Sequence, residues 1–263
     1  KDPNHRNAHM NIAAIALQNN HPKQAISHYE QALKQDPDNP EIGFILSALK
    51  QNTTSIDEAP SAYVANLFDQ YARHYNTHLM DMLRYQLPDK ITAIVHEQFK
   101  PLNNLRILDL GCGTGLLAKS LKPFANHLVG VDLSDNMLLQ AKALNLYDEM
   151  HQQDILKFLD TEAHFDLMIA AELFPYIGDP KALLTKVANR LSPKGICIFS
   201  IEYSDNNQLY TLTENARFKH CPNAIQSILT ELGCQIISQE KTTLRQHQNK
   251  PVIGVLFTIQ LLQ

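Results

Sequence analysis

The chain has 263 residues, of which 44% are hydrophobic and 19% are charged. That length fits one domain of about 200 residues with a smaller companion, and the apolar content is sufficient for a sizeable core. The formal net charge of −4 argues against a general nucleic-acid-binding protein, which needs a basic face. We therefore expect no nucleic-acid partner.

The apolar runs are short and the cysteines are scattered. No run approaches the roughly 18 residues of a membrane-spanning helix, so we expect no membrane association. The four cysteines form no Cys-x-x-Cys pair and no Cys/His pattern of a zinc site, so we expect no metal. Unpaired thiols favour a reducing, cytoplasmic setting.

Residues 1–55 are predicted to form a short all-α segment, separate from a second unit over residues 56–263. Apolar residues at helical spacing predict helices over 11–17, 23–35 and 41–50. The pattern of small, aromatic and proline residues resembles that of one tetratricopeptide repeat plus the first helix of a second. The matching residues are Ala13, Ala25, Tyr29, Ala32 and Pro37. Such a segment either binds a protein partner or packs on the rest of the chain.

Residues 51–60 have the composition of a linker, and aromatic-rich helices are expected over residues 61–87. Strand-like and helix-like patterns then alternate. Strands are expected at 106–110, 128–132, 165–170, 196–201, 235–239 and 252–260, and helices at 116–121, after Ser134, at 180–191 and at 222–232. This alternation predicts a parallel α/β sheet with helices on both faces, whose ligand binds beyond the carboxyl ends of the strands.

Glycine is concentrated at one place. The chain has only nine glycines, and Gly111, Gly113 and Gly115 fall within five residues between a predicted strand and a predicted helix. The third glycine comes one residue too early for the dinucleotide fingerprint. Asp109, two residues before the first glycine, would repel a pyrophosphate and attract an ammonium group. The loop therefore favours S-adenosylmethionine, a cationic cofactor without phosphate.

Two further acids come at strand ends: Asp132 ends the predicted strand at 128–132, and Asp154 follows the weakly strand-like residues 150–153. Asp132 is placed to accept hydrogen bonds from both ribose hydroxyls. Asp154 is placed to accept from the adenine amino group, with Leu133, Met137 and Ile155 as apolar walls. Each acid alone is weak evidence, but their order and spacing after the glycine loop point to one extended cofactor site.

These residues resemble those of class I S-adenosylmethionine-dependent methyltransferases, at Asp109, Gly111, Gly113, Gly115, Asp132 and Asp154. The resemblance implies a Rossmann-like, seven-stranded sheet whose last strand runs antiparallel, here residues 252–260. Over nearly its whole length the chain is similar to predicted methyltransferases with N-terminal tetratricopeptide repeats. That likeness covers residues 59–64, 67–72, 78–79, 83–85, 88, 175–179, 216–220, 244–245 and 251–254. Departures at Cys221, Ala224 and 246–248 concern the expected substrate end.

Methyl transfer from a sulfonium requires alignment of the nucleophile and a base only when a proton must leave. Glu172, after the strand at 165–170, could be that base or could orient an amine, and it could instead contact the cofactor or solvent. Tyr176 could stack on or hydrogen-bond the substrate. His220 could be a base near neutral pH or an ordinary surface histidine. Arg217 could clamp a carboxylate substrate or pair with a surface acid.

Tyr71 and Tyr75 lie four residues apart and would share one helix face. They could cover the cofactor's sulfonium by cation–π contact, or they could be core residues.

The leading hypothesis is a methyltransferase acting on a small-molecule or protein acceptor. Two alternatives remain open: a methyltransferase-like hydroxylase or assembly factor, and a scaffold whose repeats bind a partner under control of the cofactor.

Overall fold

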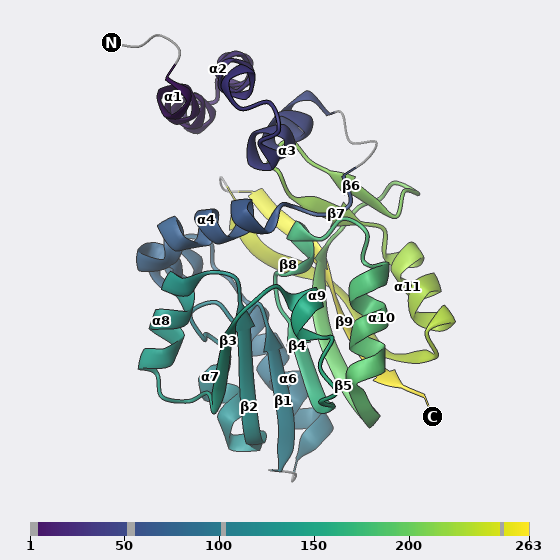
Figure 1. Ribbon diagram of the computed structural model, residues 1–263. Coiled ribbons are helices and arrows are strands. Elements are labelled where there is room, and N and C mark those ends of the chain that lie inside the picture. Colours follow the sequence, from purple (N-terminus) through teal and green to yellow (C-terminus); the bar gives the residue numbers. More distant parts are fainter. Residues whose placement is uncertain (1–4, 52–55, 101–103, 248–249, 263) are drawn as a thin grey trace.

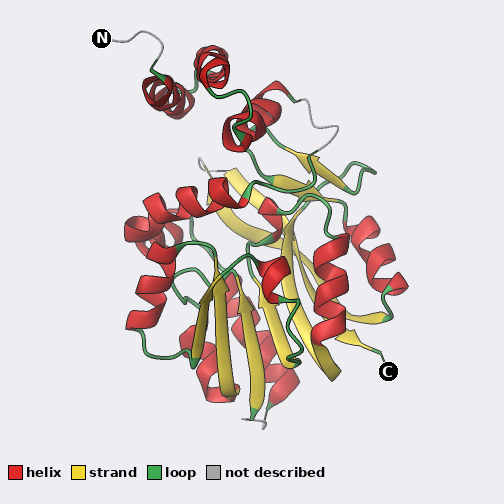
Figure 2. Ribbon diagram, viewed as in Figure 1, coloured by secondary structure: helices red, strands yellow, loops and turns green. Residues whose placement is uncertain are grey.

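The computed structural model describes residues 5–51, 56–100, 104–247 and 250–262. A small group of helices at the N-terminal end stands against one end of a larger α/β unit (Figures 1 and 2). The expected boundary at residue 55 lies outside the described residues, as do residues 52–54 of the predicted linker.

The N-terminal helices are α1 (Arg6–Gln18), α2 (Pro22–Gln35) and α3 (Pro40–Lys50), close to the predicted ranges. Pro22 and Pro40 occupy first-turn positions, where a missing N–H costs nothing. Asn39 caps α3 by accepting a 3.1 Å hydrogen bond from the Ile42 amide. The fully buried Ala13 and Ala25 let α1 and α2 approach closely, as the repeat pattern requires.

Helix α3 packs in two directions. Ile42 and Leu46 join the core of α1 and α2. Phe44 packs on the α/β unit, with ring centroids 6.2 Å from Phe218 and 5.1 Å from Tyr63. The repeat therefore packs on the rest of the chain through α3, which was one of the two arrangements expected.

The next elements are α4 (Ser61–Tyr71), η1 (Ala72–His74), α5 (Tyr75–Thr77), η2 (His78–Met82) and α6 (Leu87–Phe99). The helices predicted over 61–87 are thus interrupted by a 3-10 turn and a π turn. Helix α6 was not predicted, although its buried Leu87, Ile91, Val95 and Phe99 recur at helical spacing. Figure 1 shows α4 lying across one end of the main sheet.

The main sheet has seven strands in the order β3-β2-β1-β4-β5-β9-β8. β1 to β5 are parallel, and β9 runs antiparallel to both of its neighbours, which confirms the predicted fold. The strands are β1 (Leu105–Leu110), β2 (Ala125–Asp132), β3 (Glu149–Gln152), β4 (Phe165–Ala170), β5 (Leu191–Glu202), β8 (Cys234–His247) and β9 (Lys250–Leu261). A small sheet of β6 (Tyr210–Leu212) and β7 (Phe218–His220) was not predicted.

Helices cover both faces of this sheet. The remaining helices are α7 (Ala118–Leu121), η3 (Lys122–Phe124), α8 (Asp135–Ala143), α9 (Ile155–Phe158), η4 (Phe174–Tyr176), α10 (Lys181–Arg190) and α11 (Pro222–Glu231). Side chains alternate along each strand, so that in β1 Leu108 joins the core beneath α9, α10 and α11, whereas Ile107 joins the core beneath α6 and α7. The parallel strands all end at the edge that α4 crosses.

No helix in the described part of the chain combines the length and the apolar character that crossing a bilayer requires.

Candidate active site at the carboxyl edge of the sheet

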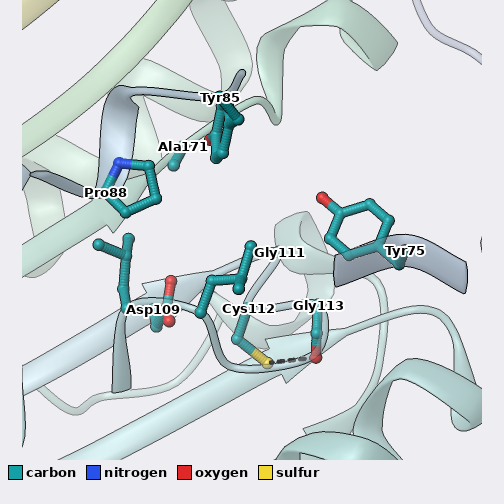
Figure 3. A pocket seen from close by; sticks show the side chains of 10 residues that line it. Tyr75, Tyr85, Pro88, Asp109, Gly111, Cys112, Gly113 and Ala171 are labelled. Carbon is teal, nitrogen blue, oxygen red and sulfur yellow. Dashed lines mark hydrogen bonds between the residues drawn. The ribbon is translucent and has the colours of Figure 1, made fainter. Parts of the chain in front are cut away.

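The glycine loop joins β1 to α7 and lines a pocket of about 370 Å³ of empty space, including its mouth. Gly111 and Gly113 face this pocket and hold positive φ angles of 70° and 54°, which favour glycine. Figure 3 shows the aromatic ring of Tyr75 and the carboxyl group of Asp109 on different sides of the open space. The lining residues are Tyr75, Tyr85, Pro88, Asp109, Gly111, Cys112, Gly113, Leu116, Leu117 and Ala171.

Gly115 does not line the pocket. A Cβ atom at this position would come within 2.9 Å of Leu144 Cδ1 and 3.1 Å of Tyr147 Cε2. The third glycine therefore allows the loop to pack closely against the segment after α8. It does not contact the pocket itself, and it contributes by fixing the backbone path of the loop.

Asp109, near the end of β1, is 3% exposed. One of its oxygens accepts a 2.7 Å hydrogen bond from the Tyr147 hydroxyl, and no basic side chain among the described residues pairs with it. Burial raises the pKa of Asp109 to about 7, and the nearby Asp132 adds to this effect. A buried carboxyl group without a counterion is suited to a cationic ligand.

Asp132 ends β2 and holds the glycine loop. Its two oxygens accept hydrogen bonds of 2.9 Å from the Gly113 amide and 2.8 Å from the Ser134 amide. Burial raises its pKa above the ordinary value, even though these amides favour the charged form.

Asp154 caps α9, the helix after β3, by accepting a 3.2 Å hydrogen bond from the Lys157 amide. Its second oxygen accepts a 3.4 Å hydrogen bond from Ser61 at the start of α4. Ile155 begins α9 beside it, and Met137 is buried at the start of α8. Asp109, Asp132 and Asp154 thus lie at the ends of three adjacent strands, but only Asp109 lines the pocket. Leu133, Met137 and Ile155 also lie outside its lining.

Residues 61–82, here called the capping segment, are fastened to the elements around the glycine loop. Asp69 accepts hydrogen bonds from Ser134 Oγ at 2.5 Å and from the Asn136 amide at 3.1 Å, both at the N-terminus of α8. Asn76 accepts one from Thr114 Oγ1, in the glycine loop, at 2.6 Å. The capping segment therefore closes the carboxyl edge of the sheet on one side.

Tyr71 and Tyr75 make an edge-on ring contact, with centroids 5.3 Å apart. Only Tyr75 lines the pocket, and its Cε1 lies 3.9 Å from where a Cβ on Gly113 would stand. The hydroxyl of Tyr71 is paired with His78 Nδ1 instead. Tyr75 thus lies at the glycine loop, whereas Tyr71 does not line the pocket.

Four charged side chains form a buried network beside the exit of β4, here called the ionic quartet: Glu172, Glu202, Arg217 and Arg245. Oε2 of Glu172 accepts from Arg217 at 2.8 Å and from Arg245 at 2.6 Å. Oε1 of Glu202 accepts from the same two arginines at 2.6 and 2.7 Å. Arg217 also donates a 2.8 Å hydrogen bond to the hydroxyl of Tyr176.

The two glutamates and two arginines of the ionic quartet carry no net charge together. Burial alone would raise the pKa of Glu202, but Arg217 and Arg245 hold it below the ordinary value. Each of the three guanidinium nitrogens of Arg217 already donates to a protein oxygen. The arrangement therefore favours a role for Arg217 in holding Glu172 and Tyr176 over the expected clamping of a carboxylate substrate.

His220 is fully buried in β7. Its Nε2 donates to the carbonyl oxygens of Ile177 at 2.8 Å and Gly178 at 3.0 Å, so the loop after β4 is pinned to the small sheet. Burial lowers the pKa of His220 to about 4, and the ring is not among the residues lining the pocket. Its surroundings favour a positioning role over that of a catalytic base.

Comparison with known proteins identifies the fold. A family model described as a methyltransferase domain matches residues 70–239, and a tetratricopeptide-repeat model matches residues 7–39. The chain belongs to the methyltransferase domain family. A ubiquinone biosynthesis O-methyltransferase of Dinoroseobacter shibae is 28% identical over an alignment of 164 residues, and the match covers 57% of this chain and 65% of that protein. The chain spans less than two thirds of the length of the curated relatives it first matches.

Solved structures show the same fold. The magnesium protoporphyrin IX methyltransferase of Synechocystis PCC 6803, with bound S-adenosylmethionine, superposes with a TM-score of 0.61 at 16% identity. The match covers 80% of this chain and 99% of that chain. The [4+2]-cyclase SpnF gives a TM-score of 0.60 at 16% identity over 79% of this chain and 99% of its own. Because a cyclase shares the fold, the reaction must be argued from the site.

The site of this methyltransferase-family chain contains residues that sequence reasoning missed. Asp69, Tyr85 and Arg245 fall in stretches of the family likeness, but nothing in the sequence indicated what they contact. Tyr147 and Glu202 carried no signal, because their partners Asp109 and Arg217 are far away in the sequence. Among the described residues, no group of three or more His, Cys, Asp or Glu side chains is arranged to hold a metal ion.

Proposed function

We propose that this chain is an S-adenosylmethionine-dependent methyltransferase acting on a small-molecule or protein acceptor. The observation that carries the proposal is the uncompensated, buried carboxyl group of Asp109 beside the Gly111 and Gly113 backbone. A carboxylate there disfavours phosphate and favours a cofactor with an ammonium group. When bound, that cofactor supplies a methyl group activated by a sulfonium.

Several side chains would hold the cofactor. Asp109 would bind its ammonium group, Asp132 its ribose hydroxyls, and Asp154 its adenine amino group. Gly111 and Gly113 would allow close approach, while Gly115 would fix the loop behind them. Leu133, Met137 and Ile155 would line the adenine side. Tyr75 would face the sulfonium, with Tyr71 bracing its ring by the edge-on contact.

On the acceptor side, the exit of β4 supplies the chemistry. Glu172 adopts a φ of 56°, a left-handed conformation that is strained for a residue with a side chain and is often found at functional sites. We propose that it accepts the acceptor's proton. Arg217, which also donates to the Tyr176 hydroxyl, would hold the carboxyl group of Glu172 in place, and Tyr176 would stack on or hydrogen-bond the acceptor. His220 would fix the loop that carries Tyr176.

The segment over residues 1–55 is proposed to be a repeat-type partner surface attached to the methyltransferase unit of residues 56–263. The match to a tetratricopeptide model over residues 7–39 supports it. A cytoplasmic setting is supported by the four free, buried cysteines.

Asp69→Ala is expected to raise the dissociation rate of S-adenosylhomocysteine about tenfold. The loss of one or two hydrogen bonds costs a net free energy of roughly 1.4 kcal/mol, and that energy corresponds to a factor of about ten. The substitution removes the side-chain hydrogen bonds from Ser134 Oγ and the Asn136 amide, and leaves the bond from Asn136 Nδ2 to the Asp69 carbonyl oxygen. Surface plasmon resonance measures the rate.

Asp135→Ala is the matched control, because it removes an exposed carboxylate from the same helix terminus without touching the capping segment. Equal dissociation rates for the two variants would contradict a role of Asp69 in retaining the cofactor.

Incubation with methyl-labelled S-adenosylmethionine and an extract of the source cells tests the function itself. We expect label in the protein fraction or in the metabolite fraction. Label in protein would support the repeat as a docking surface, and label only in metabolites would support a small-molecule acceptor. No transfer to either fraction, with cofactor bound, would contradict the methyltransferase proposal.

A further inference from the structure

One oxygen of the ionic quartet is both enclosed by protein and without a hydrogen-bond partner among the described residues. Glu172 Oε2 accepts from both Arg217 and Arg245, whereas Glu172 Oε1 is buried and finds no hydrogen-bond partner among the described residues. A buried carboxylate oxygen without a donor costs about 1–3 kcal/mol, so such an atom usually has a ligand to meet.

That oxygen belongs to a side chain beside the pocket. Glu172 directly follows Ala171, which lines it. Tyr75 and Tyr85 also line it, and although burial is the main cause of their raised pKa values, the negative charge of Glu172 contributes in both. Neither tyrosine hydroxyl has a hydrogen-bond partner within the described part of the chain. The two hydroxyls therefore have no partner among the described residues to give up when a molecule enters, and Glu172 Oε1 lies enclosed next to the pocket wall at Ala171.

The charges around Glu172 exclude one class of acceptor. Both arginines are neutralised by Glu172 and Glu202, so no basic group of the quartet remains to attract an anion. A carboxylate acceptor would bring its own lone pairs against Glu172 Oε1, without a proton between the two oxygens. A hydroxyl or amine would instead donate a hydrogen bond to that atom.

We propose that the methyl acceptor of this enzyme presents a hydrogen-bearing nucleophile, a hydroxyl or an amine, to Glu172 Oε1, and that it is not a carboxylate. This inference rests on the proposed methyltransferase function. The acceptor's hydrogen leaves as a proton to Glu172 Oε1, and its electron pair forms the new bond to the methyl carbon. The electron pair of the broken methyl–sulfur bond stays on sulfur.

The stability of the product in alkali tests the acceptor class. The fraction labelled from methyl-tritiated S-adenosylmethionine is treated with mild base, and volatile methanol is counted. Methyl ethers and methylamines survive this treatment, whereas methyl esters of carboxylates release methanol. We expect nearly all of the label to stay non-volatile. Release of most of the label as methanol would overturn the inference while leaving methyl transfer itself established.

A pair of variants tests the part played by Oε1. Glu172→Gln and Glu202→Gln each remove one negative charge from the same network, but only the first alters the enclosed, unpartnered atom Glu172 Oε1. We expect Glu172→Gln to lower transfer at least about a hundredfold more than Glu202→Gln, as for loss of a general base. S-adenosylhomocysteine affinity should remain within threefold in both. Equal losses of transfer would overturn the assignment. No transfer by the wild-type chain would contradict the proposed function instead.

Discussion

Asp109→Asn is expected to weaken S-adenosylhomocysteine binding at least about a hundredfold, which corresponds to roughly 2.7 kcal/mol. The amide keeps an oxygen for the Tyr147 hydroxyl but removes the negative charge that the ligand's ammonium group requires. The unliganded protein should be at least as stable as wild type at pH 8, because the ionised carboxyl group is buried without a counterion. Calorimetric titration and thermal unfolding measure the two quantities. Unchanged affinity would contradict the charge argument.

The same carboxyl group makes binding depend on pH. Its pKa is raised to about 7, so in the unliganded protein it contributes stability that is present at low pH and is lost as the pH rises through 7. The ligand's ammonium group favours the ionised form, so wild-type affinity should rise from pH 6 to 7, by up to about tenfold. In Asp109→Asn this dependence should disappear.

Arg245→Met is expected to lower the free energy of unfolding by about 3–5 kcal/mol, the usual cost of removing one partner from a buried ion pair. Glu172 and Glu202 would then share a single arginine inside the protein. In wild type, the lowered pKa of Glu202 contributes stability that is present above its unfolded pKa and is lost as the pH falls. The deficit of the variant should therefore shrink towards pH 4. Urea unfolding at several pH values measures it.

Arg6→Met is the control, because Arg6 forms an exposed ion pair with Asp36, and this variant should unfold at nearly the same urea concentration as the wild type. If Arg245→Met lowered the free energy of unfolding by less than about 1 kcal/mol at pH 7.5, the ionic quartet would not contribute to stability as a buried ion-pair network.

The glycine loop and the sheet could be predicted because their signals are local. The strand at 165–170 was predicted at its observed bounds, and Asp109 lies next to Gly111 and Gly113 in both sequence and space. The capping segment was predicted as ordinary helix, because residue spacing does not reveal where a 3-10 turn or a π turn interrupts it.

The ionic quartet beside the exit of β4 could not be predicted in the same way. The ionic quartet joins residues 172, 202, 217 and 245, which come from the exit of β4, the end of β5, the turn before β7, and β8. An arginine that clamps a substrate and an arginine that balances two glutamates look the same in a sequence. Only the partners within 3 Å distinguish the two roles for Arg217.

Helix α3 links the repeat to the loop that follows β4. Phe44 packs in the same cluster as Tyr176 and Phe218, and the amide of Ala59 donates to the Tyr176 carbonyl oxygen at 2.9 Å. The repeat and the loop carrying Tyr176 are therefore joined by one buried apolar cluster.

Equilibrium dialysis of the full chain against labelled S-adenosylmethionine tests the central claim most directly. We expect one bound molecule per chain, with a dissociation constant in the micromolar range, on the order of −8 kcal/mol. Absence of binding at a ligand concentration of about 1 mM, where even a −4 kcal/mol interaction is half saturated, would contradict it.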